Sequence, residues 1–316
     1  MITTSAAIHC EQIAKTYPGK TPVEAVRGID LTISVGECFG LLGPNGAGKT
    51  TTMEMIEGLL DPTSGNISIL GKSWQTDATA IRQKIGISLQ ETVMSDKLTV
   101  AETVRLFRSF YPEGLTPDEA IARVSLQEKS NSYVVKLSGG QKQRLAVACA
   151  IVGDPEVLFL DEPTTGLDPQ SRRQLWEFIQ SYRARGRTVM ITTHYMDEAE
   201  RLCDRVAIVD HGKIIACGTP KELILQLGGE HMIEFELEIT GETPKPEAFE
   251  ILPGTSHCRH AGQSYAISAT EPHIALPALM KHLQSHGYNL TTLTTRHATL
   301  EDVFVNLTGR QLREGN

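Results

Sequence analysis

The sequence predicts an α/β fold with a parallel central sheet, followed by a smaller α+β domain. Apolar runs of strand length at residues 157–160, 188–192 and 205–209 alternate with segments of helical periodicity. Strands that are apolar throughout are typical of parallel sheets, because helices cover both faces of such sheets. After Gly228 and Gly229 the pattern changes to short alternating strands and one helix, which indicates a second domain.

Composition excludes several classes of protein. The chain has 316 residues, of which 40% are hydrophobic and 22% charged, as in a globular protein. It has no apolar run of about 18 residues and no basic segment with an apolar core at its start, so we expect neither a membrane span nor a secretion signal, and a cytoplasmic location. The net charge of −8 argues against nucleic acid as a partner.

The predicted first domain begins with strands around a glycine-rich turn. Residues 8–17 and 25–33 predict two strands, the second of them alternating between polar and apolar residues. Residues 38–42 form a short apolar run, residues 49–58 favour a helix, and a further strand is expected at 66–70.

Helices are expected between these strands and the later ones. Residues 100–126 have a helical pattern, within which Thr116, Pro117 and Glu119 favour a helix start. Further helical patterns occur at 142–151, 171–185 and 196–203.

The second domain is expected at 229–316. Residues 232–239 alternate apolar with acidic residues and predict a strand, as do residues 264–268 and 290–295. Residues 273–286 favour a helix.

The turn after residues 38–42 matches the phosphate-binding pattern GxxxxGK[ST]. Its residues, with the Thr that follows, are Gly43, Pro44, Asn45, Gly46, Ala47, Gly48, Lys49, Thr50 and Thr51. Glycines allow backbone N–H groups to wrap a polyphosphate, and the positive end of the next helix faces the same charge. Lys49 can reach the β- and γ-phosphates, and the Thr50 hydroxyl can ligate Mg²⁺. We therefore expect ATP and Mg²⁺ as ligands.

The strand at 157–160 ends in two acids, Asp161 and Glu162. Ligands of an open α/β sheet bind beyond the carboxyl ends of its strands. Asp161 is therefore expected to hold Mg²⁺, and Glu162 to orient a water molecule that attacks the γ-phosphate. The plain alternative is a pair of solvated acids.

A second glycine motif precedes the helix at 142–151. It consists of Leu137, Ser138, Gly139, Gly140 and Gln141. Ser138 suits a helix cap, and the glycines leave N–H groups open to an anion. The chain thus has two predicted phosphate-binding helix starts, although one nucleotide in one subunit does not obviously need both.

The order of these motifs, with Gln90, Asp168 and His194, resembles the nucleotide-binding subunit of an ABC transporter over about residues 8–225. The resemblance implies a P-loop NTPase fold, the ABC cassette, with a RecA-like core and a helical subdomain at about 91–150. It implies an ATPase domain at 1–228. It also implies that Gln90 contacts Mg²⁺ or the attacking water and that His194 contacts the γ-phosphate.

The family also implies a head-to-tail dimer around two ATP molecules, formed by two copies or with a related ATPase subunit. Ser138 and Gly140 of one subunit would face the ATP held by the other, and Asp168 would line the seam. Tyr17 would stack on the adenine ring. Ordinary alternatives are a strand-end aromatic for Tyr17, a turn residue for Asp168, a surface amide for Gln90 and a core histidine for His194.

The segment 299–310 resembles the ending of ATPases that pair with ABC-2 type permeases, which mostly export drugs, lipids, polysaccharides or ions. This implies an integral-membrane partner that docks on residues 95–136, at the inner face of the cell membrane. From the residues alone, Thr299 is expected to cap a short helix whose apolar face packs on the second domain. That face comprises Leu300, Val303, Phe304 and Leu307.

Other functions stay open. An importer ATPase is the nearest alternative, and the 299–310 segment argues against it. Soluble translation-factor ATPases of this superfamily usually carry two cassettes, chromosome-maintenance heads need long heptad arms, and small-molecule kinases need no Ser138 motif.

The cysteines and histidines give weaker evidence for a functional site than the glycine motifs do. Most of the six cysteines lie in apolar runs and are expected to be buried and reduced. His257, Cys258 and His260, or His282 and His286, could ligate a metal, but no standard zinc spacing is met and solvated histidines are favoured.

Overall fold

The computed structural model describes residues 6–90, 92–238 and 243–308. The chain separates into two compact units, Met1–Cys217 and Gly218–Asn316. Each unit has a hydrophobic core of its own.

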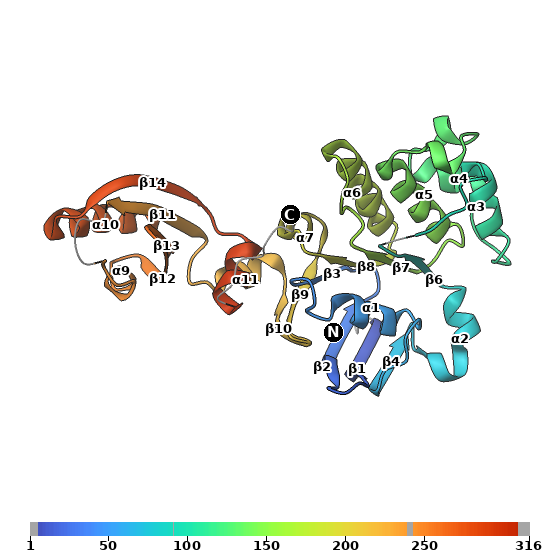
Figure 1. The fold of residues 1–316 in the computed structure, drawn as a ribbon, viewed down its shortest axis with the longest axis horizontal. Helices are drawn as coiled ribbons and strands as arrows, with labels where there is room; N and C mark the ends of the chain where they lie inside the picture. Colours follow the sequence, from blue (N-terminus) through green and yellow to red (C-terminus); the bar gives the residue numbers. More distant parts are fainter. Residues whose placement is uncertain (1–5, 91, 239–242, 309–316) are drawn as a thin grey trace. The chain divides into compact units, whose positions relative to one another are not determined.

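A six-stranded sheet with the order β10-β9-β3-β8-β7-β6 forms the centre of the first unit (Figure 1). Its strands are β3 (Cys38–Leu42), β6 (Ile85–Ser88), β7 (Val157–Asp161), β8 (Thr188–Thr193), β9 (Arg205–Asp210) and β10 (Lys213–Gly218). The neighbours from β9 to β6 pair in parallel, and every residue of β3, β7 and β8 is buried. The predicted α/β class with a parallel core is confirmed.

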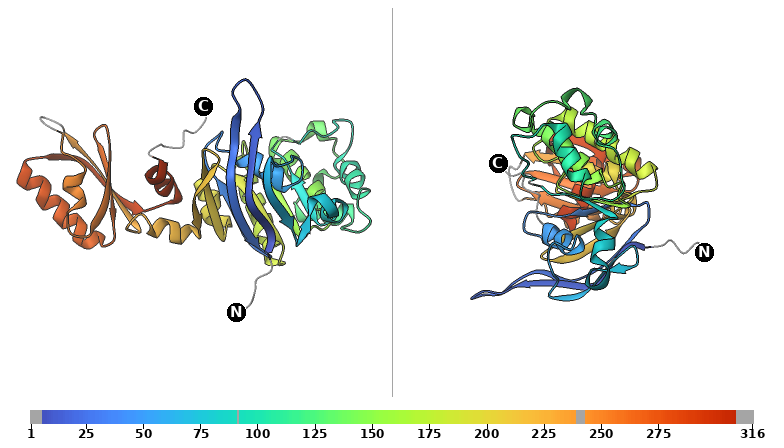
Figure 2. Two further views of the ribbon diagram at one scale, coloured as in Figure 1. Left: turned by 90° about the horizontal axis from the view of Figure 1, so that it is seen from below. Right: turned by 90° about the vertical axis from the view of Figure 1, so that its right-hand side faces the viewer.

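A second, antiparallel sheet has the order β2-β1-β4-β5. Its strands are β1 (Ala6–Tyr17), β2 (Val23–Ser34), β4 (Ser64–Ile69) and β5 (Lys72–Ser73). Figure 2 shows the β1–β2 hairpin extending beyond the rest of the first unit. The inward side chains of β1 and β2 share one core with the helix that follows the glycine-rich turn.

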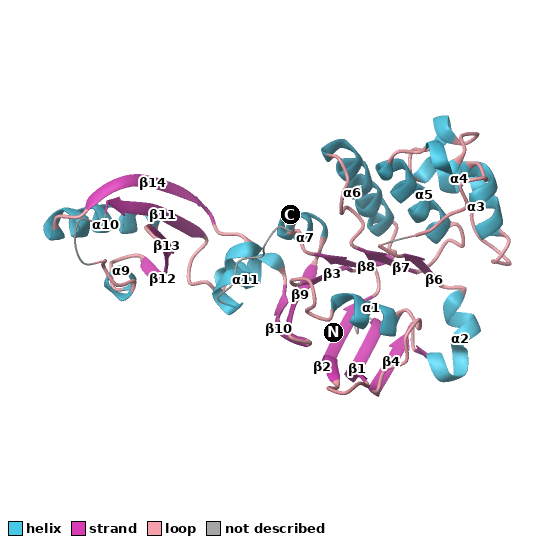
Figure 3. Ribbon diagram, in the orientation of Figure 1, coloured by secondary structure: helices cyan, strands magenta, loops and turns pink. Residues whose placement is uncertain are grey.

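Helices cover both faces of the six-stranded sheet, with α1 on the face opposite to α5 and α6 (Figure 3). The helices are α1 (Lys49–Ile56), α2 (Trp74–Arg82), α3 (Val100–Arg108), α4 (Pro117–Arg123), α5 (Gly139–Ile151), α6 (Pro169–Ala184) and α7 (Met196–Leu202), with short 3₁₀ turns η1 (Gln127–Lys129) and η2 (Val134–Lys136). Thr116 and Glu119 form the predicted capping box of α4. No helix among the described residues is long and apolar enough to cross a membrane.

The helical pattern predicted at 100–126 contains two helices, α3 and α4, and α4 begins at the helix start predicted from Thr116 and Pro117. Between α3 and α4 the chain turns at Gly114, where φ is +145° and an added Cβ would lie 2.3 Å from the carbonyl oxygen of Val152. Leu115 N also donates to Val152 O at 2.8 Å. This backbone contact holds the connection against the end of α5, and the helical pattern of the sequence does not reveal it.

The second unit contains an antiparallel sheet with the order β12-β13-β11-β14. Its elements are α8 (Pro220–Leu225), β11 (His231–Glu238), α9 (Glu247–Glu250), β12 (Thr255–Ala261), β13 (Ser264–Ala269), α10 (Pro272–His286), β14 (Asn289–His297) and α11 (Leu300–Thr308). From β11 to β14 the order β-α-β-β-α-β is the ferredoxin-like arrangement. Phe235, Phe249 and Tyr265 pack ring against ring in its core, together with α10.

Asp302 joins α11 to this sheet. Its carboxylate accepts hydrogen bonds from Arg296 Nη1 at 2.6 Å and Nη2 at 2.9 Å, and from Arg259 Nη2 at 2.8 Å. The N–H of Thr299 donates to it at 3.0 Å. Burial by itself would raise the pKa of Asp302, but these hydrogen bonds outweigh burial and lower it to about 2.

The apolar face predicted for the terminal helix is only partly correct. Leu300, Val303 and Phe304 are buried, whereas Leu307 is 46% exposed because the last turn of α11 extends past the buried contact. Gly309 and Arg310 of the resemblance, and Ile239 of the predicted strand, lie outside the described residues.

The remaining predictions concern cysteines and histidines. All six cysteines are free, and only Cys217 is exposed. Within the described ranges, no group of three or more His, Cys, Asp or Glu residues could hold a metal ion.

Asp302→Asn is expected to destabilise the second unit by about 2–3 kcal/mol, because the buried carboxylate that accepts hydrogen bonds from Arg296 and Arg259 loses its charge. The folded pKa lies below the ordinary value of 3.8, so the carboxylate stabilises the fold fully above that pH and the effect is lost as pH falls through about 2. Hydrogen–deuterium exchange of β11 and β14 at pH 7 measures the loss. The exposed neighbour Glu301→Gln serves as the control, and equal exchange in both variants would contradict the assignment.

Candidate functional site

The glycine-rich turn lies between β3 and α1 and is shaped by close backbone contacts. An added Cβ at Gly43 would lie 2.3 Å from Val209 O, and one at Gly48, where φ is +101°, would lie 2.4 Å from Ala25 O. At Gly46 such an atom would meet nothing within 4 Å. The turn is therefore packed against β9 of its own sheet at one end and against β2 of the antiparallel sheet at the other, and it is open in the middle, where its N–H groups can face an anion.

Lys49 begins α1 and lies almost completely buried at the centre of this turn. Its Nζ donates to Gly43 O at 3.0 Å and Pro44 O at 3.2 Å, and lies 3.7 Å from Glu162 Oε1. Burial lowers the pKa of Lys49, while Glu162 and Asp161 act in the opposite direction. The ammonium group is thus held at the open side of the turn, where phosphate oxygens can accept its hydrogen bonds.

Asp161 ends β7 and is 3% exposed. The hydroxyl of Thr192, on the neighbouring strand β8, donates to Asp161 Oδ1. Burial raises the pKa of Asp161, and hydrogen bonds with Thr192 and with Thr50 oppose that shift. A buried carboxylate next to a Thr hydroxyl offers the oxygen ligands that Mg²⁺ prefers, so these residues fit the expected ion.

Glu162 follows with a φ of +44°, in the left-handed region that residues other than glycine rarely adopt. Its N–H donates to Thr192 Oγ1 at 2.9 Å, which holds this turn to β8. Gln90 Nε2 lies 3.4 Å and His194 Nδ1 3.2 Å from its Oε2. The structure therefore brings Gln90, Glu162 and His194 together, next to Lys49, at the carboxyl ends of three strands.

The Ser138 motif caps α5 in the way the sequence predicts. Ser138 Oγ accepts from Gln141 N at 3.3 Å, and Gln141 Oε1 accepts from Ser138 N at 3.0 Å. A Cβ at Gly140 would lie 2.3 Å from Ser171 Oγ on α6, whereas one at Gly139 would meet nothing within 4 Å. Among the described residues, no hydrogen bond or ion pair joins this motif to the turn around Lys49.

Asp168 and Tyr17 also lie apart from the Lys49 cluster in the contacts they make. Asp168 Oδ1 caps α6 by accepting from the N–H groups of Gln170 and Ser171, both at 3.0 Å. The Ser171 hydroxyl donates to its Oδ2 at 2.6 Å and lowers the pKa of Asp168. Tyr17 ends β1 and is 38% exposed, with Lys15 Nζ 5.6 Å from the centre of its ring.

Glu57 was missed in the sequence, although an acid inside an apolar helical stretch is a visible signal. It is the C-terminal cap of α1 and is 2% exposed, and in the described part of the chain neither carboxylate oxygen has a hydrogen-bond partner. Burial, with repulsion from Asp161 and Glu54, raises its pKa to about 8. The end of a helix also disfavours an anion, so the neutral acid is the stable form.

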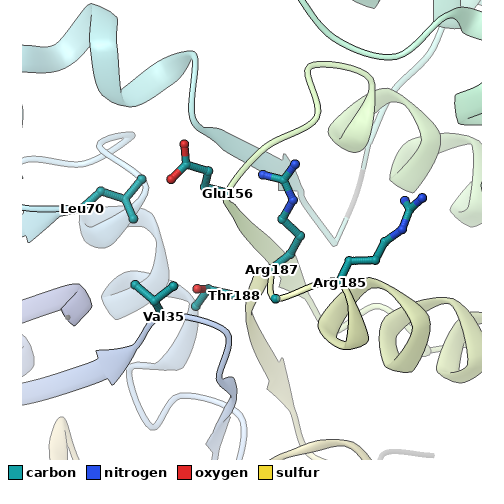
Figure 4. Close-up of a pocket in the computed structure, with 7 residues that line it drawn as sticks. Val35, Leu70, Glu156, Arg185, Arg187 and Thr188 are labelled. Atoms are coloured by element: carbon teal, nitrogen blue, oxygen red, sulfur yellow. The ribbon is translucent and has the colours of Figure 1, made fainter. Parts of the chain in front are cut away.

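A separate cavity of about 220 Å³ lies at the opposite, amino ends of β7 and β8. Figure 4 shows Val35 and Leu70 on one side of it and Arg185 and Arg187 on the other. Arg187 pairs with Asp154, and the lining residue Glu156 pairs with Lys84. This cavity is therefore not part of the site at the carboxyl ends.

Comparison with known proteins agrees with this geometry. The family described as ABC transporter matches residues 26–165. The chain is 40% identical over 316 positions to a Nod factor export ATP-binding protein I of Burkholderia orbicola, covering 98% of this chain and 99% of that protein. It is 36% identical to the protein of the same name in Sinorhizobium fredii, covering 98% and 88%.

Solved structures show the same fold in the first part of the chain. A dimeric ATP-binding cassette in a post-hydrolysis state with ADP and Pi has a TM-score of 0.62 and 27% identity, covering 67% of this chain and 98% of that chain. The ATP-binding subunit of an ABC transporter has a TM-score of 0.63 and 28% identity, covering 70% and 93%.

Glu57→Gln is expected to remove a pH dependence of stability. The folded pKa of about 8 lies above the ordinary 4.5, so Glu57 destabilises the fold progressively as pH rises between these values. Relative to the parent protein, the variant should gain about 2–3 kcal/mol between pH 5.5 and pH 8. Urea unfolding at both pH values measures this, with the exposed Glu113→Gln as control. Parallel pH profiles for parent and variant would show that Glu57 is charged in the folded protein.

Proposed function

Because this chain belongs to the ABC transporter family of ATP-binding proteins, we propose that it powers export through an ABC-2 type membrane permease. The chain is an ATPase. The relatives that match 98% of its length are named as export ATP-binding proteins. The cluster in which Glu162 lies beside Lys49, Gln90 and His194 supports ATP hydrolysis, and the names of the relatives support export. We propose residues 1–228 as the ATPase domain, with its helical subdomain at about 91–150, and residues 229–316 as an accessory domain.

The proposed chemistry follows from the position of each group in this cluster. Backbone N–H groups of residues 43–51, apart from Pro44, and the ammonium of Lys49 bind the β- and γ-phosphates. Asp161, Thr50 and Gln90 would hold Mg²⁺, which would neutralise phosphate charge. Glu162 orients the attacking water, because its carboxylate lies 3.7 Å from Lys49 Nζ and between the side chains of Gln90 and His194. His194 stabilises the charge that develops on the γ-phosphate.

We propose that a second subunit completes the site. The Ser138 motif makes its capping bonds within α5 and leaves Gly139 facing open space. A relative of known structure is a dimeric cassette, which supports a head-to-tail pair of two copies, or of this chain and a related ATPase subunit. Residues 138–141 of one subunit would contact the ATP of the other, with Asp168 at the seam. Tyr17 would stack on the adenine.

The docking site for the permease is proposed on the helical subdomain. Large apolar side chains are exposed there, namely Val93 (95%), Phe110 (68%), Val135 (56%), Tyr133 (49%) and Leu106 (47%). Exposed apolar groups clustered in one segment are typical of contact surfaces. Docking there would place the chain at the inner face of the membrane. The relatives are named for Nod factor export, and the cargo class proposed for this chain is a drug, lipid, polysaccharide or ion.

Glu162→Gln is expected to retain ATP binding and lose at least about 100-fold in turnover, because the amide cannot accept a proton from the attacking water. The rate of phosphate release measures turnover, and equilibrium dialysis measures ATP binding. Glu156→Gln, at the amino end of the same strand, is the matched control. Hydrolysis within a few-fold of the parent rate would exclude Glu162 from the proposed role.

Ser138→Arg is expected to abolish ATP-driven pairing in the Glu162→Gln background while nucleotide binding to the monomer persists. The arginine would fill the space into which the γ-phosphate of the other subunit must enter. Sedimentation velocity with and without ATP measures pairing, and the exposed Ser109→Arg is the control. ATP-dependent pairing at the level of the parent would rule out the head-to-tail site.

A further inference from the structure

The strand β14 is an uncovered border of the ferredoxin-like sheet. It pairs with β11 on one side, and the sheet order places no described strand on the other (Figure 1). Seven of its nine residues are exposed. At its midpoint Leu293 is 39% exposed, although the rings and aliphatic groups of the core lie on the same face of the sheet. The border therefore offers free backbone groups and an apolar side chain.

This border lacks the features that usually prevent edge-to-edge pairing. Exposed edge strands are commonly protected by Lys, Pro or unpaired charges, or by being short. The sequence of β14, NLTTLTTRH, contains no Lys, Pro, Gly, Asp or Glu, and four of its residues are β-branched Thr. Its one full charge, Arg296, is held by Glu234 and Asp302. A register shift in the pairing with β11 lies between Leu290 and Thr292, before Leu293.

We propose that β14 pairs antiparallel with β14 of a second copy of this chain, about a two-fold axis at Leu293. In this register Leu293 meets its own symmetry mate, and Thr292 lies opposite Thr294 of the partner subunit. Thr–Thr pairs are favourable across antiparallel strands, and no like charges face one another. The two sheets become one of eight strands, with the core faces on the same side.

A second copy of this chain is the partner that best fits the free edge of β14. Only a two-fold arrangement places each exposed Leu293 against an identical apolar group, as isologous interfaces do. If the proposed nucleotide-dependent dimer forms, it also holds two copies in one complex and raises their effective concentration. This last support rests on the proposed function, whereas the pairing itself needs no nucleotide.

The test is the oligomeric state of the full chain without nucleotide, measured by sedimentation at increasing concentration. The parent protein is expected to form a dimer. Leu293→Lys places two ammonium groups face to face and should weaken the dimer at least about tenfold. An equimolar mixture of Leu293→Lys and Leu293→Glu should restore pairing as a heterodimer. Ser264→Lys, exposed on the interior strand β13, is the control and should leave the dimer unchanged.

Several results would overturn the pairing. A parent chain that stays monomeric up to about 100 times the concentration used for ATP assays, or a dimer that Leu293→Lys leaves intact, would do so, as would a mixture of opposite charges that does not re-pair. Failure here is distinct from failure of the proposed function. Leu293→Lys in the Glu162→Gln background should still pair when ATP is added, and that ATP-dependent pairing is the one sensitive to Ser138→Arg.

Discussion

One lysine and two carboxylates lie together, largely buried, at the carboxyl ends of β3 and β7, and the partners that they find there stabilise this part of the first unit. Lys49, Asp161 and Glu162 are 5%, 3% and 9% exposed. Burying such charges is costly unless each has partners. The partners are loop carbonyls for the lysine and the Thr192 hydroxyl for the aspartate. The polyphosphate and Mg²⁺ of the proposed function have charges that would match this arrangement.

The central sheet holds these three charged residues close to one another. Strands β3, β7 and β8 are buried along their whole length, so the ends from which the charged residues project are held in register by parallel pairing. The hydroxyl of Thr192, at the end of β8, contacts both acidic residues. It accepts a hydrogen bond from the backbone N–H of Glu162 and donates one to the carboxylate of Asp161. The hydrogen bond from Glu162 N to Thr192 holds the strained backbone at Glu162. In this position the carboxylate of Glu162 lies next to Gln90 and His194. Strain stored at such a point is typical of functional sites.

In the second unit, too, a buried carboxylate with hydrogen-bond partners holds two elements together. Its core is aromatic and aliphatic, and the terminal helix α11 is joined to the sheet by the buried carboxylate of Asp302. A buried anion with two guanidinium partners specifies where the helix lies, since few other positions satisfy all of its hydrogen bonds. The border strand β14 lies in the same unit and carries Arg296, so one residue links the helix anchor to the exposed edge.

The sequence alone determined the features that depend on local order. The parallel α/β class, the glycine-rich turn before α1, the two acids at the end of β7 and the caps at Thr116 and Ser138 were all predictable, because each is encoded within a few neighbouring residues. The tertiary structure alone decided which distant residues meet. Thr192 bridges Asp161 and Glu162 from another strand, and Glu57 becomes an isolated buried acid only when α1 packs onto the sheet. Contacts across the chain set the break at Gly114, the exposure of Leu307 and the partners of Asp302. Spacing along a sequence carries no record of these, since they arise from the packing of segments far apart in the chain.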